Sequence, residues 1–286
     1  MSATSVALGL VGAGIGRSLT PAMQEREGRE QGLALTYRLV DAEAPGRRGF
    51  GVEDLADVLA AAERFGLDGL NVTHPFKQAV VPLLDELSEG AADLGAVNTV
   101  VLRDGRRVGH NTDTTGYGAA LAAALPESRG DRAVLVGAGG AGVAVGYGLL
   151  EQGIAHLAVH DQDAERADAC VVRLAKRWGD DRVTAVDDLS RAVAGAQGLV
   201  NATPVGMHGH PGLPVPAELV RDDLWVSDVV YFPLETELVA LARSRGCRVL
   251  PGGAMAVQQA VGAFELFTGR PADAARMQRH FAELTA

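Results

Sequence analysis

The segment Gly137-Ala138-Gly139-Gly140-Ala141-Gly142 constrains the possible fold more than any other part of this chain. It follows an apolar stretch at 133–136 that is typical of a buried strand, and it opens a stretch of helical character that extends to about residue 152. In such a strand–loop–helix unit, the first glycine permits a tight turn, the second lets the backbone approach a pyrophosphate, and the third allows close packing. The segment therefore predicts a dinucleotide-binding unit.

Strands and helices alternate on both sides of this segment. Downstream, we expect strands at 133–136, 156–160, 183–186, 198–201, 225–230 and 248–250, with helices between most of them. Upstream, we expect strands at 6–11, 35–40 and 69–72, helices at 21–31, 52–64 and 82–94, and a hairpin around Asp104-Gly105. This alternation predicts an α/β protein with a parallel, doubly wound sheet. Two helices follow Gly252-Gly253, and we expect the chain to return to the first domain there.

Composition and charge narrow the class of partner. The 286 residues carry a formal net charge of -10 and have no basic run, which argues against binding to nucleic acid or to an anionic membrane. An anionic substrate would have to be attracted by local groups. The chain lacks the features of a signal peptide or a membrane span, so we expect a soluble cytoplasmic protein. Cys170 and Cys247 are expected to be buried thiols, and neither they nor His110, His208 and His210 indicate a metal site.

The acidic residue expected about 20 residues after the glycine loop is Asp161. Its carboxylate would accept a bond from the ribose 2′-hydroxyl of NAD and would repel the 2′-phosphate of NADP. The alternative role for Asp161 is to cap the helix that begins after Gln162. Arg166 is expected one turn into that helix, beside the adenine or facing solvent. The alternative is that this arginine meets the 2′-phosphate of NADP, which would weaken the prediction of NAD.

Two further segments, Asn71–Lys77 and Gly109–Asp113, carry polar chemistry without the periodicity of a core element. Taken alone, Lys77 would be a solvated surface lysine, Asp113 a helix N-cap and Asn98 a turn residue. A lysine and a carboxylate positioned by tight loops can also bind a polyol and move a proton. Together with the dinucleotide loop, they predict an oxidoreductase that acts on a small hydroxylated substrate.

A set of ordered motifs makes the sequence resemble the shikimate dehydrogenase family, which includes the quinate/shikimate dehydrogenases. The resemblance covers nearly the whole chain. The matching segments are Ser18-Leu19-Thr20-Pro21, Asn71-Val72-Thr73-His74-Pro75-Phe76-Lys77, Ala96-Val97-Asn98-Thr99, Gly109-His110-Asn111-Thr112-Asp113, Gly137-Ala138-Gly139-Gly140-Ala141, Asn201-Ala202-Thr203-Pro204-Val205-Gly206-Met207, Asp228-Val229-Val230-Tyr231, and Gln259 ahead of Ala263-Phe264.

The resemblance implies two domains with the active site between them. Residues 1–113 with 255–286 would bind substrate, and residues 114–254 would form the Rossmann domain. Lys77 would be the acid/base and would pair with Asp113. The implied substrate contacts are Ser18, Thr20 and Tyr231 at the carboxylate, and Thr73, Asn98, Asp113 and Gln259 at the ring hydroxyls. To the cofactor contacts already predicted at the glycine loop, Asp161 and Arg166, the resemblance adds Thr203 and Pro204 near the ribose and phosphates, and Val229, Gly252 and Met255 near the nicotinamide.

Two departures from the family pattern bear on specificity. The shikimate-type motif usually reads His-Ser-x-Ser-Pro, whereas this chain has Arg17-Ser18-Leu19-Thr20-Pro21, and the threonine resembles the quinate/shikimate subgroup. NADP-using relatives typically carry Asn-Arg-Thr where this chain has His160-Asp161-Gln162, which favours NAD. The leading prediction is therefore an NAD-dependent quinate/shikimate dehydrogenase, a monomer or homodimer. The alternatives are the biosynthetic NADP-dependent enzyme, an amino-quinate or aminoshikimate dehydrogenase, and a nucleotide-sensing module without catalysis.

Overall fold

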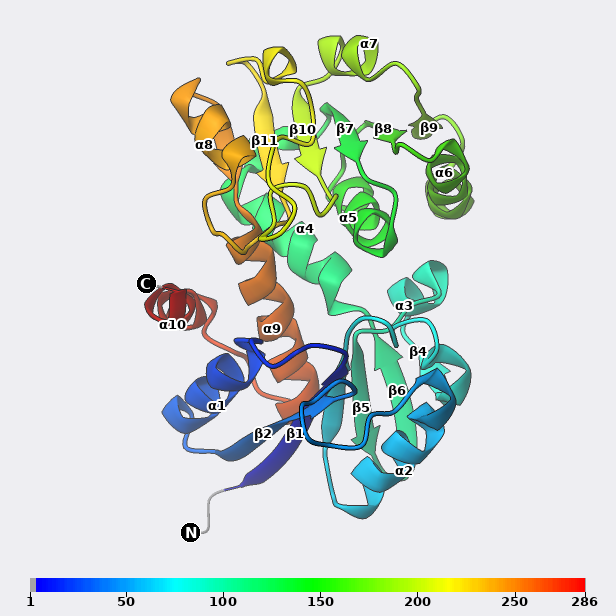
Figure 1. The fold of residues 1–286 in the computed structure, drawn as a ribbon, viewed down its shortest axis with the longest axis vertical. Coiled ribbons are helices and arrows are strands. Elements are labelled where there is room, and N and C mark those ends of the chain that lie inside the picture. Colours follow the sequence, from blue (N-terminus) through cyan, green and yellow to red (C-terminus); the bar gives the residue numbers. More distant parts are fainter. Residues whose placement is uncertain (1–3, 286) are drawn as a thin grey trace. The chain divides into compact units, whose positions relative to one another are not determined.

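The computed structural model describes residues 4–285, which form two compact units (Figure 1). Unit 1 comprises the chain up to Thr112 together with the residues from Gln259 onward, and unit 2 comprises Asp113–Gln258. Helix α9 (Gly252–Thr268) is continuous across the second junction, so its first turns belong to unit 2 and its remainder to unit 1.

Unit 1 is built on a mixed sheet of six strands in the order β2-β1-β3-β5-β6-β4. Strand β1 pairs in parallel with β2 and β3, β3 and β6 are antiparallel to β5, and β4 is parallel to β6. The strands are β1 (Ser5–Gly12), β2 (Ala34–Asp41), β3 (Gly69–Val72), β4 (Glu86–Leu87), β5 (Thr99–Arg103) and β6 (Arg106–His110). The helices are α1 (Thr20–Glu30), α2 (Leu55–Arg64), α3 (Glu89–Leu94), most of α9, and α10 (Ala274–Thr285), with 3₁₀ turns at Val52–Asp54 and Val81–Leu83.

The predicted hairpin is confirmed, and one predicted helix is wrong. Asp104 and Gly105, with φ of 54° and 72°, join β5 to β6, as a two-residue type I′ turn requires. The helix expected at 82–94 is instead a 3₁₀ turn, the short strand β4 and helix α3. Pairing of β4 with β6 overrides the local helical pattern, and a new helix begins only after Ser88.

The sheet of unit 1 has an apolar core on each face. One cluster joins Val11 of β1 to Leu55 and Leu59 of α2, and the other joins Leu8 of β1 to Phe264 of α9. Side chains of a strand alternate between faces, so α2 and α9 cover opposite sides of the sheet. Gly69 is required where α9 packs, because a Cβ there would lie 2.3 Å from Cε1 of Phe267.

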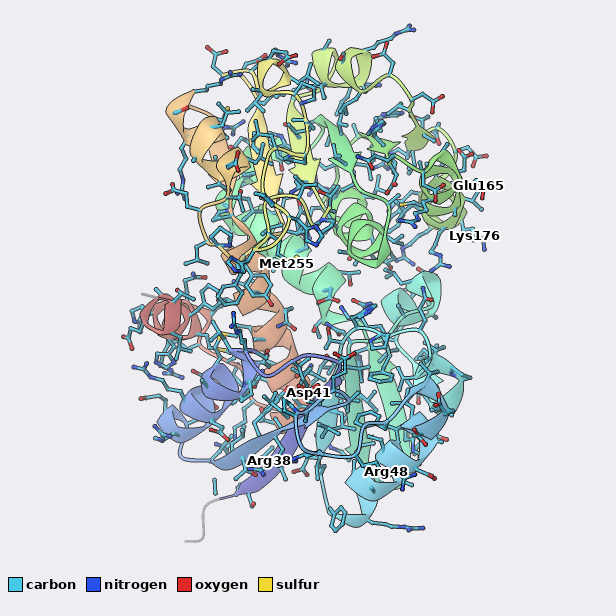
Figure 2. The ribbon with its side chains drawn as sticks, in the orientation of Figure 1. Arg38, Asp41, Arg48, Glu165, Lys176 and Met255 are labelled. Atoms are coloured by element: carbon cyan, nitrogen blue, oxygen red, sulfur yellow. The ribbon has the colours of Figure 1, made fainter. Side chains whose placement is uncertain are left out.

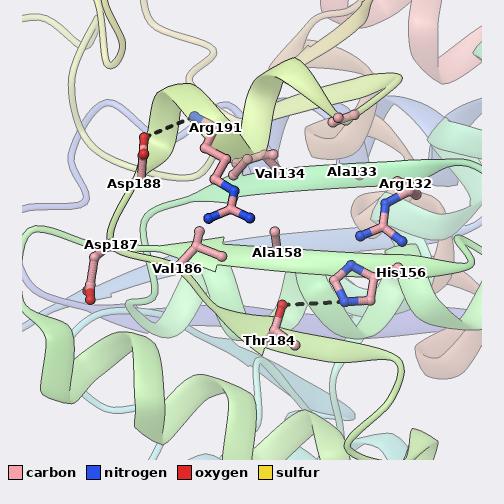
Figure 3. Close-up of a pocket in the computed structure, with 13 residues that line it drawn as sticks. Arg132, Ala133, Val134, His156, Ala158, Thr184, Val186, Asp187, Asp188 and Arg191 are labelled. Atoms are coloured by element: carbon pink, nitrogen blue, oxygen red, sulfur yellow. Dashed lines mark hydrogen bonds between the residues drawn. The ribbon is translucent and has the colours of Figure 1, made fainter.

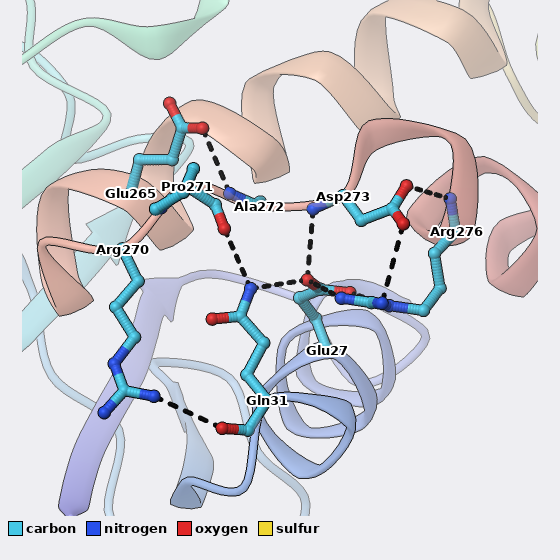
Figure 4. A network of polar contacts seen from close by, with 8 residues as sticks. All are labelled: Glu27, Gln31, Glu265, Arg270, Pro271, Ala272, Asp273 and Arg276. Atoms are coloured by element: carbon cyan, nitrogen blue, oxygen red, sulfur yellow. Dashed lines mark hydrogen bonds and ion pairs between the residues drawn. The ribbon is translucent and has the colours of Figure 1, made fainter.

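A buried carboxylate joins α1 to the C-terminal helices (Figure 4). Glu27 is fully buried and accepts bonds from Arg276 Nη2 at 2.6 Å, Arg276 Nε at 2.8 Å, Gln31 Nε2 at 2.8 Å and the Asp273 N–H at 3.1 Å. Burial raises the pKa of Glu27, but these bonds outweigh burial and the net pKa lies below its ordinary value. These hydrogen bonds hold the start of α10 against α1.

Unit 2 is a wholly parallel sheet of six strands, which confirms the predicted doubly wound α/β fold. Its order, β12-β11-β10-β7-β8-β9, reverses direction between β7 and β10, and ligands bind at such switch points. The strands are β7 (Arg132–Val136), β8 (His156–His160), β9 (Val183–Ala185), β10 (Gly198–Asn201), β11 (Trp225–Asp228) and β12 (Arg248–Leu250). The helices are α4 (Thr112–Ala124), α5 (Gly140–Glu151), α6 (Ala164–Trp178), α7 (Leu189–Ala194) and α8 (Glu237–Ser244), with 3₁₀ turns at Pro126–Ser128 and Ala217–Leu219.

Within residues 4–285, none of the helices is long and apolar enough to cross a membrane, and histidine, cysteine and acidic side chains nowhere gather in threes as a metal ion would need. Cys170 and Cys247 are free and buried, and burial raises the pKa of Cys170 to about 12. Both thiols therefore behave as core side chains.

Candidate active site

The glycine loop of unit 2 has the backbone geometry that a pyrophosphate site needs. Gly137 has a φ of 99° and donates its N–H to the His160 carbonyl at 2.8 Å. A Cβ on Gly142 would lie 2.0 Å from the Gly137 carbonyl oxygen, so only glycine fits. Gly139 precedes α5 without a side-chain cap, and nothing lies within 4 Å of a Cβ built on Gly139 or Gly140. The helix N-terminus is thus open to an anion, and the loop fits a dinucleotide.

Asp161 faces this loop and does not cap the next helix. It directly follows β8, and its Oδ2 accepts the Ala138 N–H at 2.7 Å while Oδ1 accepts the Asp163 N–H at 3.0 Å. The cap of α6 is Asp163, which accepts from the N–H groups of Glu165 and Arg166. The capping alternative for Asp161 is therefore wrong, and its carboxylate lies beside the phosphate-binding backbone.

Arg166 stands in the first turn of α6 with its side chain 68% exposed. Its Nε lies 3.1 Å from Asp163 Oδ2, so the guanidinium already has an anionic partner. This pairing weakens any attraction of Arg166 for a 2′-phosphate.

A buried polar network lies at the carboxyl ends of strands β10 and β11. Asn201 Oδ1 accepts the Thr203 N–H at 3.0 Å and the Thr203 hydroxyl at 2.7 Å. Asp228 accepts from Asn201 Nδ2 at 2.9 Å, from the Val230 N–H at 3.0 Å and from the Thr236 hydroxyl at 2.6 Å. Burial raises the pKa of Asp228, and these three bonds oppose that rise. The network holds Thr203 at the edge beside Gly137, where Pro204 follows it.

The start of α9 packs on the end of β11. A Cβ on Gly252 would lie 2.5 Å from the Val229 carbonyl oxygen and 2.4 Å from that of Val230. Met255, labelled in Figure 2, follows in the first turn of α9 and is half-buried. Unit 2 therefore brings together Val229 and Gly252, with Met255 one turn along. Tyr231 also lies in unit 2, exposed, with its ring 4.9 Å from that of Phe232.

In unit 1, Ser18 and Thr20 lie where the loop after β1 enters α1. The Ser18 N–H donates to the Ile15 carbonyl at 2.9 Å, and the Thr20 N–H donates to Ser18 Oγ at 3.3 Å. Helix α1 starts at Thr20 and has no side-chain cap. Both hydroxyl groups therefore stand on a short, internally bonded turn.

The segment after β3 lies against this loop. The Thr73 N–H donates to the Val11 carbonyl at 2.9 Å, and the Ala13 N–H donates to the His74 carbonyl at 3.0 Å. The peptide bond between His74 and Pro75 is cis. Lys77 is half-buried, and its carbonyl accepts the Val97 N–H at 2.8 Å. This bond places the Lys77 backbone next to the residue that precedes Asn98.

Asn98 fixes the beginning of α4. It is 4% exposed, its Oδ1 accepts the Thr112 N–H at 2.7 Å, and its Nδ2 donates to Thr112 Oγ1 at 3.0 Å. Helix α4 begins at Thr112, so Asp113 lies inside the first turn and the N-cap interpretation of Asp113 is wrong. Unit 1 thus brings the backbone of Lys77, Asn98 and Thr112 together, and Asp113 follows directly along the chain.

The polar core behind Asn98 is larger than the sequence interpretation recognised. Tyr37 donates its hydroxyl to Asn71 Oδ1 at 2.7 Å, and Asn71 Nδ2 donates to Thr99 Oγ1 at 2.9 Å. Thr99 in turn donates to Asn98 Oδ1 at 3.0 Å. Polar side chains inside predicted buried strands are the sequence feature that indicates such a network, because buried polar groups need hydrogen-bond partners.

Gln259 stands on α9 and is half-buried, and the residues that follow it at Ala260 and Ala263 are buried. It opens the C-terminal part of the chain that belongs to unit 1.

A cavity of about 490 Å³ lies elsewhere in unit 2, over β7, β8 and β9 beside α7 (Figure 3). Arg132 and His156 are the first residues of their strands, whereas the glycine loop follows the last residue of β7. Arg132 and Arg191 are balanced there by Asp187 and Asp188, and burial and nearby arginines lower the pKa of His156. None of the thirteen lining residues is a predicted site residue, so the site expected from the sequence is not this cavity.

Comparison with known proteins gives consistent matches over the whole chain. Residues 10–100 match the family model described as "Shikimate dehydrogenase substrate binding domain", and residues 254–280 match "Shikimate 5'-dehydrogenase C-terminal domain". The chain is 52% identical to a protein of Streptomyces avermitilis named shikimate dehydrogenase (NADP(+)), covering 99% of this chain and 97% of the relative. It is 48% identical to a protein of Corynebacterium glutamicum strain R named quinate/shikimate dehydrogenase (NAD(+)), covering 98% and 99%.

Solved structures agree with these matches. The structure described as quinate dehydrogenase from Corynebacterium glutamicum in complex with NAD superposes with a TM-score of 0.93 at 47% identity, covering 98% of this chain and 99% of that one. Shikimate 5-dehydrogenase from Listeria monocytogenes, in complex with shikimate and NAD, gives a TM-score of 0.87 at 31% identity, with 96% of each chain covered.

Proposed function

Because the chain belongs to the shikimate dehydrogenase family, we propose that it is an NAD-dependent quinate/shikimate dehydrogenase. It oxidises a ring hydroxyl of quinate to give 3-dehydroquinate, and of shikimate to give 3-dehydroshikimate. The observation that carries the cofactor choice is Asp161, whose carboxylate lies at the glycine loop on the Ala138 N–H.

Sequence identity does not decide between NAD and NADP, because relatives with 52% identity are named as NADP-dependent and relatives with 48% identity are named as NAD-dependent. The local chemistry does decide between them. A carboxylate at the end of β8 accepts a bond from a ribose hydroxyl and repels a 2′-phosphate, since like charges at such short range cost free energy. The ion pair with Asp163 lessens the attraction of Arg166 for a 2′-phosphate.

NAD would be held by the residues that border the carboxyl ends of the parallel strands. The glycine loop would bind its phosphates, Asp161 its adenosine ribose, and Thr203 and Pro204 the adjoining ribose and phosphates. Val229, Gly252 and Met255 would lie near the nicotinamide. When bound, NAD supplies the hydride acceptor.

The substrate would be held chiefly by unit 1. Ser18 and Thr20 would donate their hydroxyl groups to its carboxylate, and Tyr231 is the third residue that the family resemblance assigns to that carboxylate. The ring hydroxyls would be bound by Thr73, Asn98, Asp113 and Gln259. Short side chains on tightly bonded turns suit this task, because little freedom is lost when a small rigid ligand binds.

Lys77 would take the proton. Oxidation of a secondary alcohol removes the hydroxyl proton as the carbon loses its hydride to NAD, and Lys77 Nζ accepts that proton. Asp113 would orient the lysine and accept a bond from a neighbouring hydroxyl of the ring. Asn98 contributes indirectly as well, because it fixes Thr112 immediately before Asp113.

The proposal also covers the cellular compartment and the oligomeric state. The enzyme acts in the cytoplasm, where its two unpaired thiols stay reduced, and it functions as a monomer or homodimer. The one rival with an observation in its favour is the NADP-dependent shikimate dehydrogenase named for the Streptomyces relative.

Absorbance at 340 nm tests the proposal, with quinate and shikimate each assayed against NAD and NADP. We expect reduction of NAD with both substrates and a lower kcat/KM with NADP. Lys77→Ala serves as the control with strongly reduced activity. A wild type that prefers NADP identifies the rival enzyme, and no reduction under any of the four conditions excludes both.

A further inference from the structure

Asp41 ends strand β2 of unit 1 and is labelled in Figure 2. Its carboxylate reaches across to the loop that follows the neighbouring strand β1. Oδ1 accepts the Gly14 N–H at 2.9 Å, and Oδ2 accepts the Ile15 N–H at 3.1 Å. A further bond from the Glu43 N–H to Oδ1, at 3.0 Å, fixes the carboxylate itself. Hydrogen bonds to a charged acceptor are about twice as strong as neutral ones, so this loop is firmly held.

The bonds continue from this loop to the residues assigned to the substrate carboxylate. The Ile15 N–H donates to Asp41 Oδ2, and the Ile15 carbonyl accepts the Ser18 N–H at 2.9 Å. Ser18 Oγ then accepts the Thr20 N–H at 3.3 Å. Two residues away from Ile15, the Ala13 N–H is bound to the His74 carbonyl. Asp41 thus controls one side of a loop whose other side is tied to the Thr73–Lys77 segment.

Nothing in the substrate chemistry requires contact with Asp41, since an anionic side chain would repel a carboxylate. Its effect would come through the backbone. Gly14, with φ of 65°, and Ile15 turn their N–H groups toward Asp41, so those donors are occupied. The hydroxyl groups of Ser18 and Thr20 are the donors that we assign to the substrate carboxylate.

We propose that Asp41 is a positioning residue that sets the loop carrying Ser18 and Thr20 for binding the substrate carboxylate. This inference rests on the proposed function. Without the charge on Asp41, the loop would become ordered only when the substrate binds. The entropic cost of ordering the loop would then weaken substrate binding.

Asp68 offers a matched control in the same unit. Its Oδ2 accepts the Ala7 N–H at 2.8 Å, so it also binds the backbone of β1 through a carboxylate. Ala7 lies five residues before Gly12, about 16 Å along the strand at roughly 3.3 Å per residue. Asp68→Asn therefore removes the negative charge from the same kind of backbone hydrogen bond, far from the loop.

The test compares Asp41→Asn with Asp68→Asn in steady-state kinetics. For Asp41→Asn we expect KM for quinate to rise about 10-fold at saturating NAD, with kcat within about 3-fold of wild type and KM for NAD unchanged. Asp68→Asn should leave all three constants unchanged. Methyl quinate, which lacks the negative charge, should show little difference between wild type and Asp41→Asn.

Equal KM values in the two variants, or an equal penalty for quinate and methyl quinate, would overturn the positioning role. Should Asp41→Asn not fold, Asp41→Glu keeps the charge and moves it by one methylene. A few-fold rise in its KM for quinate supports the role, and an unchanged KM overturns it. A wild type inactive toward both quinate and shikimate overturns the proposed function together with this inference, whereas an active wild type with an unaffected Asp41→Asn overturns only the inference.

Discussion

The two units use the same device at their binding edges. In each, a central strand has parallel partners on both sides, β2 and β3 around β1, and β8 and β10 around β7. In each, an aspartate at the end of the next strand accepts N–H groups from the loop after the central strand, Asp41 in unit 1 and Asp161 in unit 2. Parallel sheets bind ligands at this kind of crevice.

The loops themselves differ, and the difference decides what each unit can bind. In unit 2, glycines lead directly into α5 and leave bare backbone facing outward. In unit 1, the loop is longer and ends in Ser18 and Thr20 at the start of α1. Backbone N–H groups at a helix N-terminus suit a pyrophosphate, whereas hydroxyl groups on a turn suit a small carboxylate. A common scaffold therefore acquires its ligand from a few loop residues.

The units also differ in how their cores are completed. Unit 2 is one continuous stretch of chain, and unit 1 needs residues from both ends of the protein. The join in unit 1 includes the buried Glu27 and its partner Arg276. We therefore expect changes in unit 1 to alter substrate binding and stability in acid, and changes at the glycine loop of unit 2 to alter cofactor binding.

The largest effect is expected for Lys77→Ala, which removes the proposed proton acceptor. General acid/base groups usually contribute roughly 100-fold or more to kcat, and NAD binding should change far less because the residue lies in unit 1. Steady-state kinetics with quinate measures both constants. A kcat near that of wild type would show that another group, Asp113 or a water, takes the proton.

Asp113→Asn sharpens that result, since it keeps the shape of Asp113 and removes its charge. We expect kcat/KM to collapse while the fold survives. Because the two residues would act as a unit, the Lys77→Ala/Asp113→Asn double variant should be little worse than the poorer single variant. Fully additive losses would show that Lys77 and Asp113 work independently.

A stability effect of about 2 kcal/mol is expected for Arg276→Gln, because it leaves a buried carboxylate short of its charged donor. Chemical denaturation at pH 7 measures it, and Glu27→Gln in the same background should recover part of the loss. Arg243→Gln, which breaks the exposed ion pair with Glu235 in unit 2, is the control and should change little.

The same pair gives a pH dependence. The pKa of Glu27 is lower in the folded protein than its ordinary value of 4.5, so its stabilising effect is complete above that value and is lost as the pH falls through the folded pKa. Stability should therefore drop in mild acid in the wild type. Arg276→Gln should flatten that drop, and an unchanged acid profile would contradict the role given to the pair.

The smallest effect is expected for Thr20→Ser. Its hydroxyl is kept, so carboxylate binding should persist, and the lost methyl is worth only about 1 kcal/mol in a pocket. We expect the quinate-to-shikimate ratio of kcat/KM to move toward shikimate, while Thr20→Val should weaken both substrates by removing the donor. An unchanged ratio in Thr20→Ser would place quinate specificity elsewhere, with Arg17 the next candidate.

Local pattern was enough to predict most of this molecule. The glycine motif, the strands at 69–72, 156–160 and 198–201, and the Asp104-Gly105 turn all follow from short-range rules. The helix expected at 82–94 failed because β4 pairs with β6, a partner distant in sequence. The loop role of Asp41 and the network from Tyr37 to Thr112 were likewise missed, since both depend on which strands become neighbours.

The central claim is tested most directly by the ratio of kcat/KM for NAD to that for NADP, measured with saturating quinate in wild type and in Asp161→Asn. We expect wild type to prefer NAD and Asp161→Asn to narrow that preference, because the substitution weakens the ribose contact and relieves repulsion of the 2′-phosphate. A wild type that prefers NADP, or a ratio that Asp161→Asn leaves unchanged, would contradict this claim.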